Sequence, residues 1–180
     1  GPASTIRSLT WEGLFETGAA PLRRLMERKI ALQSGERFDL EYIEDSEEEI
    51  LYLLHEMHYA HASVDIEAQA FPEEEAVDIQ IKVDLGAPCV FGPITLVGDY
   101  DAPESKVRDV ITLREGDAYK GSELGTTQKE LFGLGIFSVV NIVPQLDPGG
   151  DPVVPVRIEV STTRPKELRL GGGLGWENGK

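Results

Sequence analysis

Three histidines stand close together in the first half of the chain and are the first residues to consider for chemistry. His55, His58 and His61 lie three residues apart, so on a helix their rings would fan out in steps of about 60°. Two of them could chelate a metal ion, but helical zinc sites ordinarily use a spacing of four residues, and no cysteine is near. A solvated helix end is the simpler interpretation, and we expect no metal site and no cofactor.

Two acidic runs, at residues 47–49 and 73–75, could be taken for paired catalytic carboxylates. The first falls at an expected helix start, where negative charge is favoured, and the second falls in an expected turn, so solvation accounts for both. Glycines at 171–173 and 175 lack the Lys-Ser or Lys-Thr of a phosphate loop. Since no Gly-x-Ser-x-Gly motif occurs, we expect no catalytic residues and no enzyme.

The charge balance excludes one class of partner. The 180 residues hold 32 Asp and Glu against 17 Lys and Arg, a net charge of −15, which repels phosphates and anionic lipid. We therefore expect no nucleic-acid partner. With 41% hydrophobic residues the chain can build packed cores. Its single cysteine, Cys89, rules out an intrachain disulfide.

Hydrophobic periodicity predicts the same order of elements in each half of the chain. Residues 64–69 and 77–84 alternate apolar and polar side chains, the pattern of strands with one wet face. A helix precedes them, and Ser46 followed by Glu49 predicts a capping box at its start. The first half reads as strand, helix, helix, strand, strand over residues 5–14, 22–30, 46–57, 64–69 and 77–84. The second half repeats that order over residues 94–98, 104–111, 124–134, 139–146 and 153–163.

Short motifs align the two halves as copies of one module. Gly13 matches Gly98 after the first strand, residues 35–38 match 116–119 between the helices, and residues 58–60 match 135–137 before the hairpin. The offsets fall from 85 to 81 to 77 residues, which indicates a diverged tandem repeat.

The second copy resembles the POTRA domain, as found before the barrel in outer-membrane assembly factors of the BamA and TamA type, also called bacterial surface antigens. The matching segments are residues 94–98, 116–119, 131–140 and 156–160. The first copy departs from the pattern at His58, where the family usually has a glycine. The resemblance implies an α+β fold of two tandem β-α-α-β-β domains, each a small three-stranded mixed sheet with two helices on one face. We place these domains at residues 5–86 and 87–164.

The end of the sequence reads as the start of a membrane barrel strand. Leu168, Leu170, Leu174 and Trp176 share one strand face, and a positively charged residue and glycines share the other, which is the alternation of a lipid-facing strand. We expect residues 165–180 to be the truncated first strand of a barrel. The chain would then be an arm on the periplasmic side of the bacterial outer membrane, in a protein integral to that membrane.

The resemblance implies that the third strand of each module is central and the second is at an edge. An edge strand offers unpaired N–H and C=O groups to an extended peptide. The candidate client-binding edge is Val139, Val140, Asn141, Ile142 and Val143. A second candidate is Ser63, Val64, Asp65, Ile66 and Glu67, although its acidic residues and Pro72 look like edge protection.

The expected function is therefore non-covalent. The arm would bind or guide unfolded outer-membrane protein segments by strand addition, beside its own C-terminal barrel and together with periplasmic or inner-membrane assembly subunits. Two alternatives remain open: the arm of a dedicated secretion pore, and a purely structural spacer that orients the barrel. Pro88 and Pro93 restrict the segment between the modules and favour limited motion.

Overall fold

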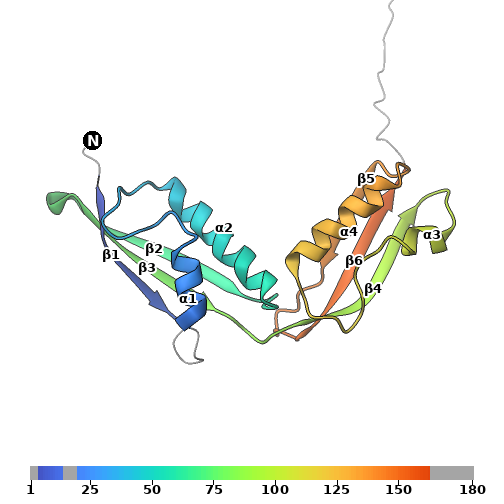
Figure 1. Ribbon diagram of the computed structural model, residues 1–180, viewed down its shortest axis with the longest axis horizontal. Coiled ribbons are helices and arrows are strands. Elements are labelled where there is room, and N and C mark those ends of the chain that lie inside the picture. The colour runs from blue at the N-terminus through green and yellow to red at the C-terminus, as the bar shows by residue number, and fades with distance from the viewer. Residues whose placement is uncertain (1–3, 14–19, 163–180) are drawn as a thin grey trace, which may run out of the picture.

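The chain forms two domains that follow one another and meet at a bend (Figure 1). The computed structural model describes residues 4–13 and 20–162. The first domain consists of β1 (Thr5–Glu12), α1 (Ala20–Glu27), α2 (Glu41–Glu56), β2 (Ser63–Phe71), the short 3-10 helix η1 (Pro72–Glu74) and β3 (Ala76–Asp84). The second consists of β4 (Val90–Asp99), α3 (Glu104–Arg108), α4 (Gly121–Gly133), β5 (Val139–Pro144) and β6 (Val153–Ser161).

Both sheets have the predicted topology. The strand orders are β1-β3-β2 and β4-β6-β5, so the third strand of each module is central and the second is at an edge. The first strand runs parallel to the central strand, and the second runs antiparallel to it. In each domain the long helix covers one face of the sheet (Figure 1). The predicted α+β fold of two tandem β-α-α-β-β domains is confirmed.

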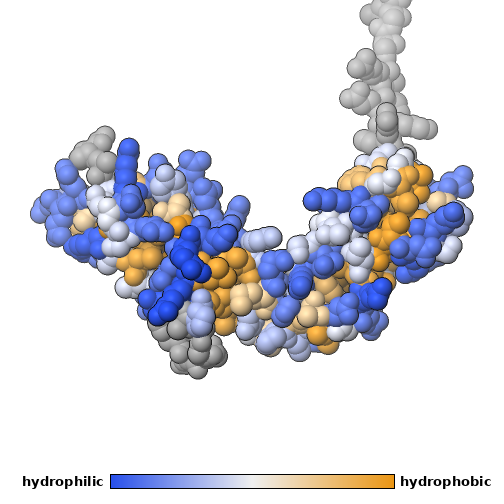
Figure 2. All heavy atoms as spheres, viewed as in Figure 1, coloured by the Kyte–Doolittle hydropathy of each residue, from blue (hydrophilic) through white to orange (hydrophobic). Residues whose placement is uncertain are grey.

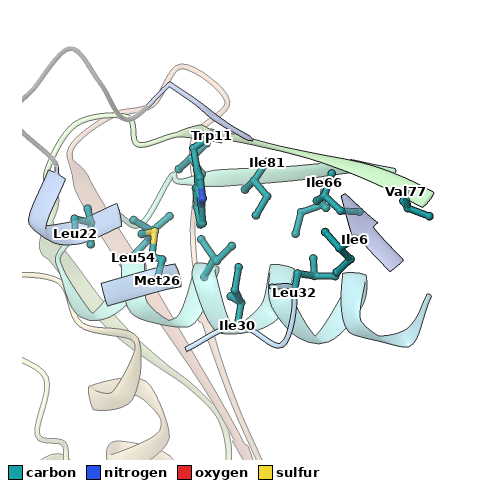
Figure 3. Close-up of a cluster of buried hydrophobic side chains, with 13 residues drawn as sticks. Ile6, Trp11, Leu22, Met26, Ile30, Leu32, Leu54, Ile66, Val77 and Ile81 are labelled. Atoms are coloured by element: carbon teal, nitrogen blue, oxygen red, sulfur yellow. The ribbon is translucent and has the colours of Figure 1, made fainter. Parts of the chain in front are cut away.

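The alternation of apolar and polar residues places one core under the helices of each domain. In β3 the apolar residues Ile79, Ile81 and Val83 are buried, because successive strand residues point to opposite faces. They pack with helix residues such as Met26 and Leu54 in the first core (Figure 3). The second core is a separate cluster built around β6. Ala60 of the first module packs in this second core, so the two modules also touch.

One physical reason explains both matched glycines, Gly13 directly after β1 and Gly98 near the end of β4. Gly13 and Gly98 have φ values of 88° and 142°, which L-residues rarely adopt. A Cβ on Gly13 would overlap the carbonyl oxygen of Val83, and a Cβ on Gly98 would overlap that of Val160. The first strand can therefore reach the end of the central strand only where it carries a glycine.

The predicted capping box at Ser46 is wrong. Helix α2 begins at Glu41, and the Asp39 carboxylate accepts a hydrogen bond from the Glu41 N–H at 3.2 Å. Ser46 lies inside the helix and is buried, and its hydroxyl has no hydrogen-bond partner among the residues that the structure describes. The pattern misled because Asp39, about two helical turns before Ser46, already offers a side-chain acceptor at the helix start, and the helix then continues through the acidic residues of its first turns. None of the helices within residues 4–13 and 20–162 is long and apolar enough to cross a membrane.

Candidate binding edges and the junction between the domains

Strand β5 forms the outer edge of the second sheet, as predicted. The Gln145 N–H donates to the Pro155 carbonyl at 2.8 Å, and residue pairs along an antiparallel ladder alternate between hydrogen-bonded and open. The register from Val139 opposite Ser161 to Pro144 opposite Val156 therefore turns the backbone groups of Val140 and Ile142 outward, away from β6.

One of these outward groups is already occupied by the domain's own helix. Gln128 of α4 donates from its side-chain amide to the Val140 carbonyl at 2.8 Å. This bond is direct evidence that the backbone of Val140 faces the open edge. Two residues further on, Ile142 directs its N–H and C=O the same way. A client strand would pair with Ile142 directly and would compete with Gln128 at Val140.

In the first sheet, a charged side chain likewise occupies an outward backbone group of the edge strand. The Ile66 N–H of β2 donates to a carboxylate oxygen of Glu47, on α2, at 3.1 Å. Residues 47–49 were expected to be merely solvated, and this expectation is wrong for Glu47. Nothing in the local sequence signals the contact, because Glu47 and Ile66 come together only when α2 packs across the sheet.

The side chains along the two edges differ in charge. In β2, Asp65 and Glu67 are exposed on the open face of the sheet, and the Glu67 carboxylate pairs with Lys82 at 2.8 Å. In β5 the predicted residues are uncharged: Val139 and Asn141 are exposed, Val140 is buried, and Ile142 and Val143 are half-buried. An incoming strand therefore meets carboxylates at the first edge and none along β5.

The histidines do not form the solvated helix end expected from the sequence. The His58 ring donates from Nδ1 to the Tyr119 carbonyl at 2.8 Å, and the His61 ring donates from Nε2 to the Asp151 carbonyl at 2.8 Å. His55 meets the Tyr119 ring edge-on, with centroids 6.2 Å apart. All three contacts cross from the first module to the second. No three His, Cys, Asp or Glu side chains within the described part of the chain are arranged to hold a metal ion.

A carboxylate of the first domain caps a helix of the second. Glu56, the last residue of α2, accepts hydrogen bonds from the Ser122 N–H at 2.6 Å and from the Ser122 hydroxyl at 2.8 Å. Ser122 lies in the first turn of α4, where N–H groups have no partner within the helix. Gly121 permits the close approach, since a Cβ there would lie 3.2 Å from the His55 Cβ.

Backbone contacts complete the junction. The Cys89 N–H donates to the His58 carbonyl at 2.7 Å, and the Tyr119 N–H donates to the Cys89 carbonyl at 3.0 Å. His58 itself has φ of 77°, the left-handed conformation that Gly135, with φ of 70°, takes at the matching point of the second module. The segment between the domains is thus tied to the end of α2 through both main chain and side chains.

Burial at the junction shifts the pKa values of two titratable side chains in opposite directions. Partial burial lowers the pKa of His55 below its ordinary 6.5, against a smaller opposing effect of the negative charge on Glu56. Burial likewise raises the pKa of the Tyr119 hydroxyl. Both shifts favour the uncharged forms of the two side chains.

The predicted membrane-facing residues Leu168, Leu170, Leu174 and Trp176 lie outside the described residues. The chain therefore presents two modules, each with an edge strand and a long helix, joined at a junction with many polar contacts. Such an arrangement suits non-covalent recognition of an extended backbone.

Comparison with known proteins agrees with this architecture. The family model for POTRA, described as surface antigen variable number repeat, matches residues 4–86 and 90–162. The chain belongs to this family.

Solved structures share the fold. BamA POTRA domains 3–5 of Haemophilus influenzae match with a TM-score of 0.75 and 22% identity, over 89% of this chain and 62% of that one. BamA of Haemophilus ducreyi lacking POTRA domains 1–3 matches with a TM-score of 0.69 and 22% identity, over 87% of this chain and 29% of that one. POTRA domains 1–2 of Omp85 from Anabaena match with a TM-score of 0.55 and 14% identity, over 87% and 95%. The chain spans less than two thirds of the two BamA chains.

Proposed function

We propose that the chain is the periplasmic arm of an outer-membrane protein assembly or translocation factor, and that it receives unfolded barrel segments by strand addition to β5. Membership of the POTRA family supports the arm. The barrel itself would follow residue 164, with its first strand beginning at residues 165–180. The work is non-covalent, because the recognised groups are main-chain N–H and C=O.

The observation that carries the proposal is the outward backbone of Ile142 on an uncharged edge. A neighbouring strand gains main-chain hydrogen bonds largely independently of its sequence, which suits a receptor for many clients. The first edge is the poorer candidate, because Glu47 holds the Ile66 N–H and exposed carboxylates line the strand. Client segments would therefore enter at the second domain.

A specific observation also favours a spacer role for the junction. Side-chain and main-chain hydrogen bonds cross between the domains from Glu56, His58 and His61. A junction held at this many points would give the arm a fixed bend. Orientation of the barrel and capture of a client are compatible, because the junction contacts do not use β5.

The test measures binding of unfolded barrel peptides to the chain and repeats it with Ile142→Pro. Proline removes the outward N–H of Ile142 without altering the bonds between β5 and β6 at residues 141 and 143. Ile142→Ala is the matched control, because it trims the half-buried side chain and keeps the N–H. Loss of affinity in the proline variant alone is the expected result. Equal affinity in all three chains would discard strand addition at β5.

A further inference from the structure

The corner of the first domain where its chain leaves is the surface that meets the next module. The end of α2, the start of β2 and the end of β3 come together there, since Ser63 pairs with Asp84. From this corner His55, Glu56 and His58 contact the second domain. The position of a residue within the module therefore indicates whether it faces the module that follows.

The second domain has the same corner. Val139, at the start of β5, pairs with Ser161, at the end of β6, and the Ser138 N–H donates to the Ser161 carbonyl at 2.8 Å. Figure 1 places the end of β6 beside the C-terminal end of α4. Gly135 has φ of 70°, close to the 77° of His58, so the two turns are equivalent in backbone conformation as well as in sequence.

The chemistry of the two corners is opposite. At the 77-residue offset, His55 corresponds to Phe132, Glu56 to Gly133, and Tyr59 to Ile136. Three polar groups that reach the next domain in the first copy, His55, Glu56 and His58, are thus replaced by an apolar side chain and two glycines. The fourth, His61, is replaced by the smaller Ser138. Phe132, Ile136 and Val139 are 44%, 38% and 47% exposed. Figure 2 shows hydrophobic residues along the part of the second domain where Figure 1 places β5 and β6.

We propose that Phe132, Ile136 and Val139 form the docking surface for the part of the protein's own chain that follows Thr162, which under the proposed function is the membrane barrel. We call these three residues the exit patch. Contact through the exit patch is apolar, because all three of its side chains are hydrophobic. Gly133 stands where the first domain has the Glu56 carboxylate that caps α4. The portion that follows Thr162 therefore meets the arm with hydrophobic side chains rather than with a helix N-terminus.

The test uses the full-length protein in its membrane, with Phe132 replaced by the photo-crosslinker p-benzoylphenylalanine. The expected result is an intrachain crosslink to residues beyond 162, mapped by mass spectrometry. The control places the same crosslinker at Tyr52, which is 54% exposed on α2 of the first domain. Tyr52 is not part of the exit patch and should give no such product. Crosslinking of Phe132 to a different polypeptide or to a second copy, or the absence of any crosslink, would overturn the proposal.

A double variant, Phe132→Asp with Ile136→Asp, gives an independent readout. Both side chains are exposed, so the second domain should unfold at nearly the same temperature, while proteases should cleave the chain just after Thr162 several times faster. Unchanged cleavage would overturn the docking. Client binding through Ile142 is measured separately and should persist in this variant, so the docking proposal and the strand-addition proposal can fail independently.

Discussion

Glu56 and Ser122, in different domains, form the cap of helix α4: the Glu56 carboxylate accepts both the N–H and the hydroxyl hydrogen of Ser122, at 2.6 and 2.8 Å. Most helix caps come from residues next to the helix in sequence. Here the capping residue, Glu56, belongs to a helix of the preceding domain. Folding of α4 and the angle between the domains are therefore coupled.

Replacing Glu56 should loosen the junction. In Glu56→Ala the Ser122 N–H loses its protein partner, and we expect the second domain to lose about 1 kcal/mol of stability, as for other lost helix caps. The spread of domain orientations, measured by residual dipolar couplings, should widen. Glu48→Ala, at an exposed position of the same helix, is the matched control. A Glu56→Ala chain with unaltered couplings would contradict a junction held by this cap.

Acid should weaken the junction through His55. Its pKa is lowered by burial in the folded protein, whereas the unfolded chain titrates near the ordinary 6.5. Below that pH the unfolded state binds more protons than the folded state, so the free energy of unfolding decreases as pH falls, until it passes the folded pKa. Above the ordinary pKa both states are neutral and His55 contributes no pH dependence.

The check is a titration of the His55 ring by NMR, together with chemical unfolding at several pH values. His55→Phe keeps an aromatic ring against Tyr119 and should remove part of the pH dependence below 6.5. A His55 midpoint at or above its ordinary pKa, or the same pH dependence in His55→Phe, would contradict the assignment.

The strands and the matched positions of Gly13 and Gly98 could be predicted, because short stretches of the sequence carry both signals. Alternation over residues 77–84 sets the buried face of β3, and Gly13 and Gly98 mark the close approach of strand ends. The junction was not predictable in this way. His58 and Tyr119 are 61 residues apart and His61 and Asp151 are 90 apart, and an exposed-looking helix end carries no sign of a distant carbonyl. The hydrogen bond from Gln128 to the Val140 carbonyl could not be predicted for the same reason, since a glutamine on a helix is ordinarily solvated.

Gly98→Ala should destabilise the second domain strongly. The added Cβ would overlap the Val160 carbonyl oxygen, at φ of 142°, and backbone strain of this kind costs on the order of 1–3 kcal/mol even before the overlap is relieved. Gly125→Ala is the matched control, because its Cβ would meet nothing within 4 Å and alanine favours a helix interior by roughly 0.5–1 kcal/mol. Thermal unfolding should therefore move in opposite directions for the two variants. Equal stability would contradict the close-approach explanation.

Removing Gln128 should open the β5 edge. In Gln128→Ala the Val140 carbonyl loses the amide that donates to it at 2.8 Å, so a client strand no longer has to displace it. We expect tighter binding of unfolded barrel peptides, by a factor of a few, since one neutral hydrogen bond is worth about 1 kcal/mol net. Glu47→Ala, the corresponding change in the first domain, should leave peptide binding at β5 unchanged. Weaker binding by Gln128→Ala would show that α4 assists the client instead of competing with it.

The most direct test of client capture follows a single amide. Hydrogen exchange at the Ile142 N–H, recorded by NMR with and without an unfolded barrel peptide, reports whether that outward group gains a partner. We predict that saturating peptide slows this exchange while the Asn141 N–H, already directed at β6, changes little. An Ile142 amide that exchanges equally fast with peptide bound elsewhere on the arm would contradict the proposed role of β5.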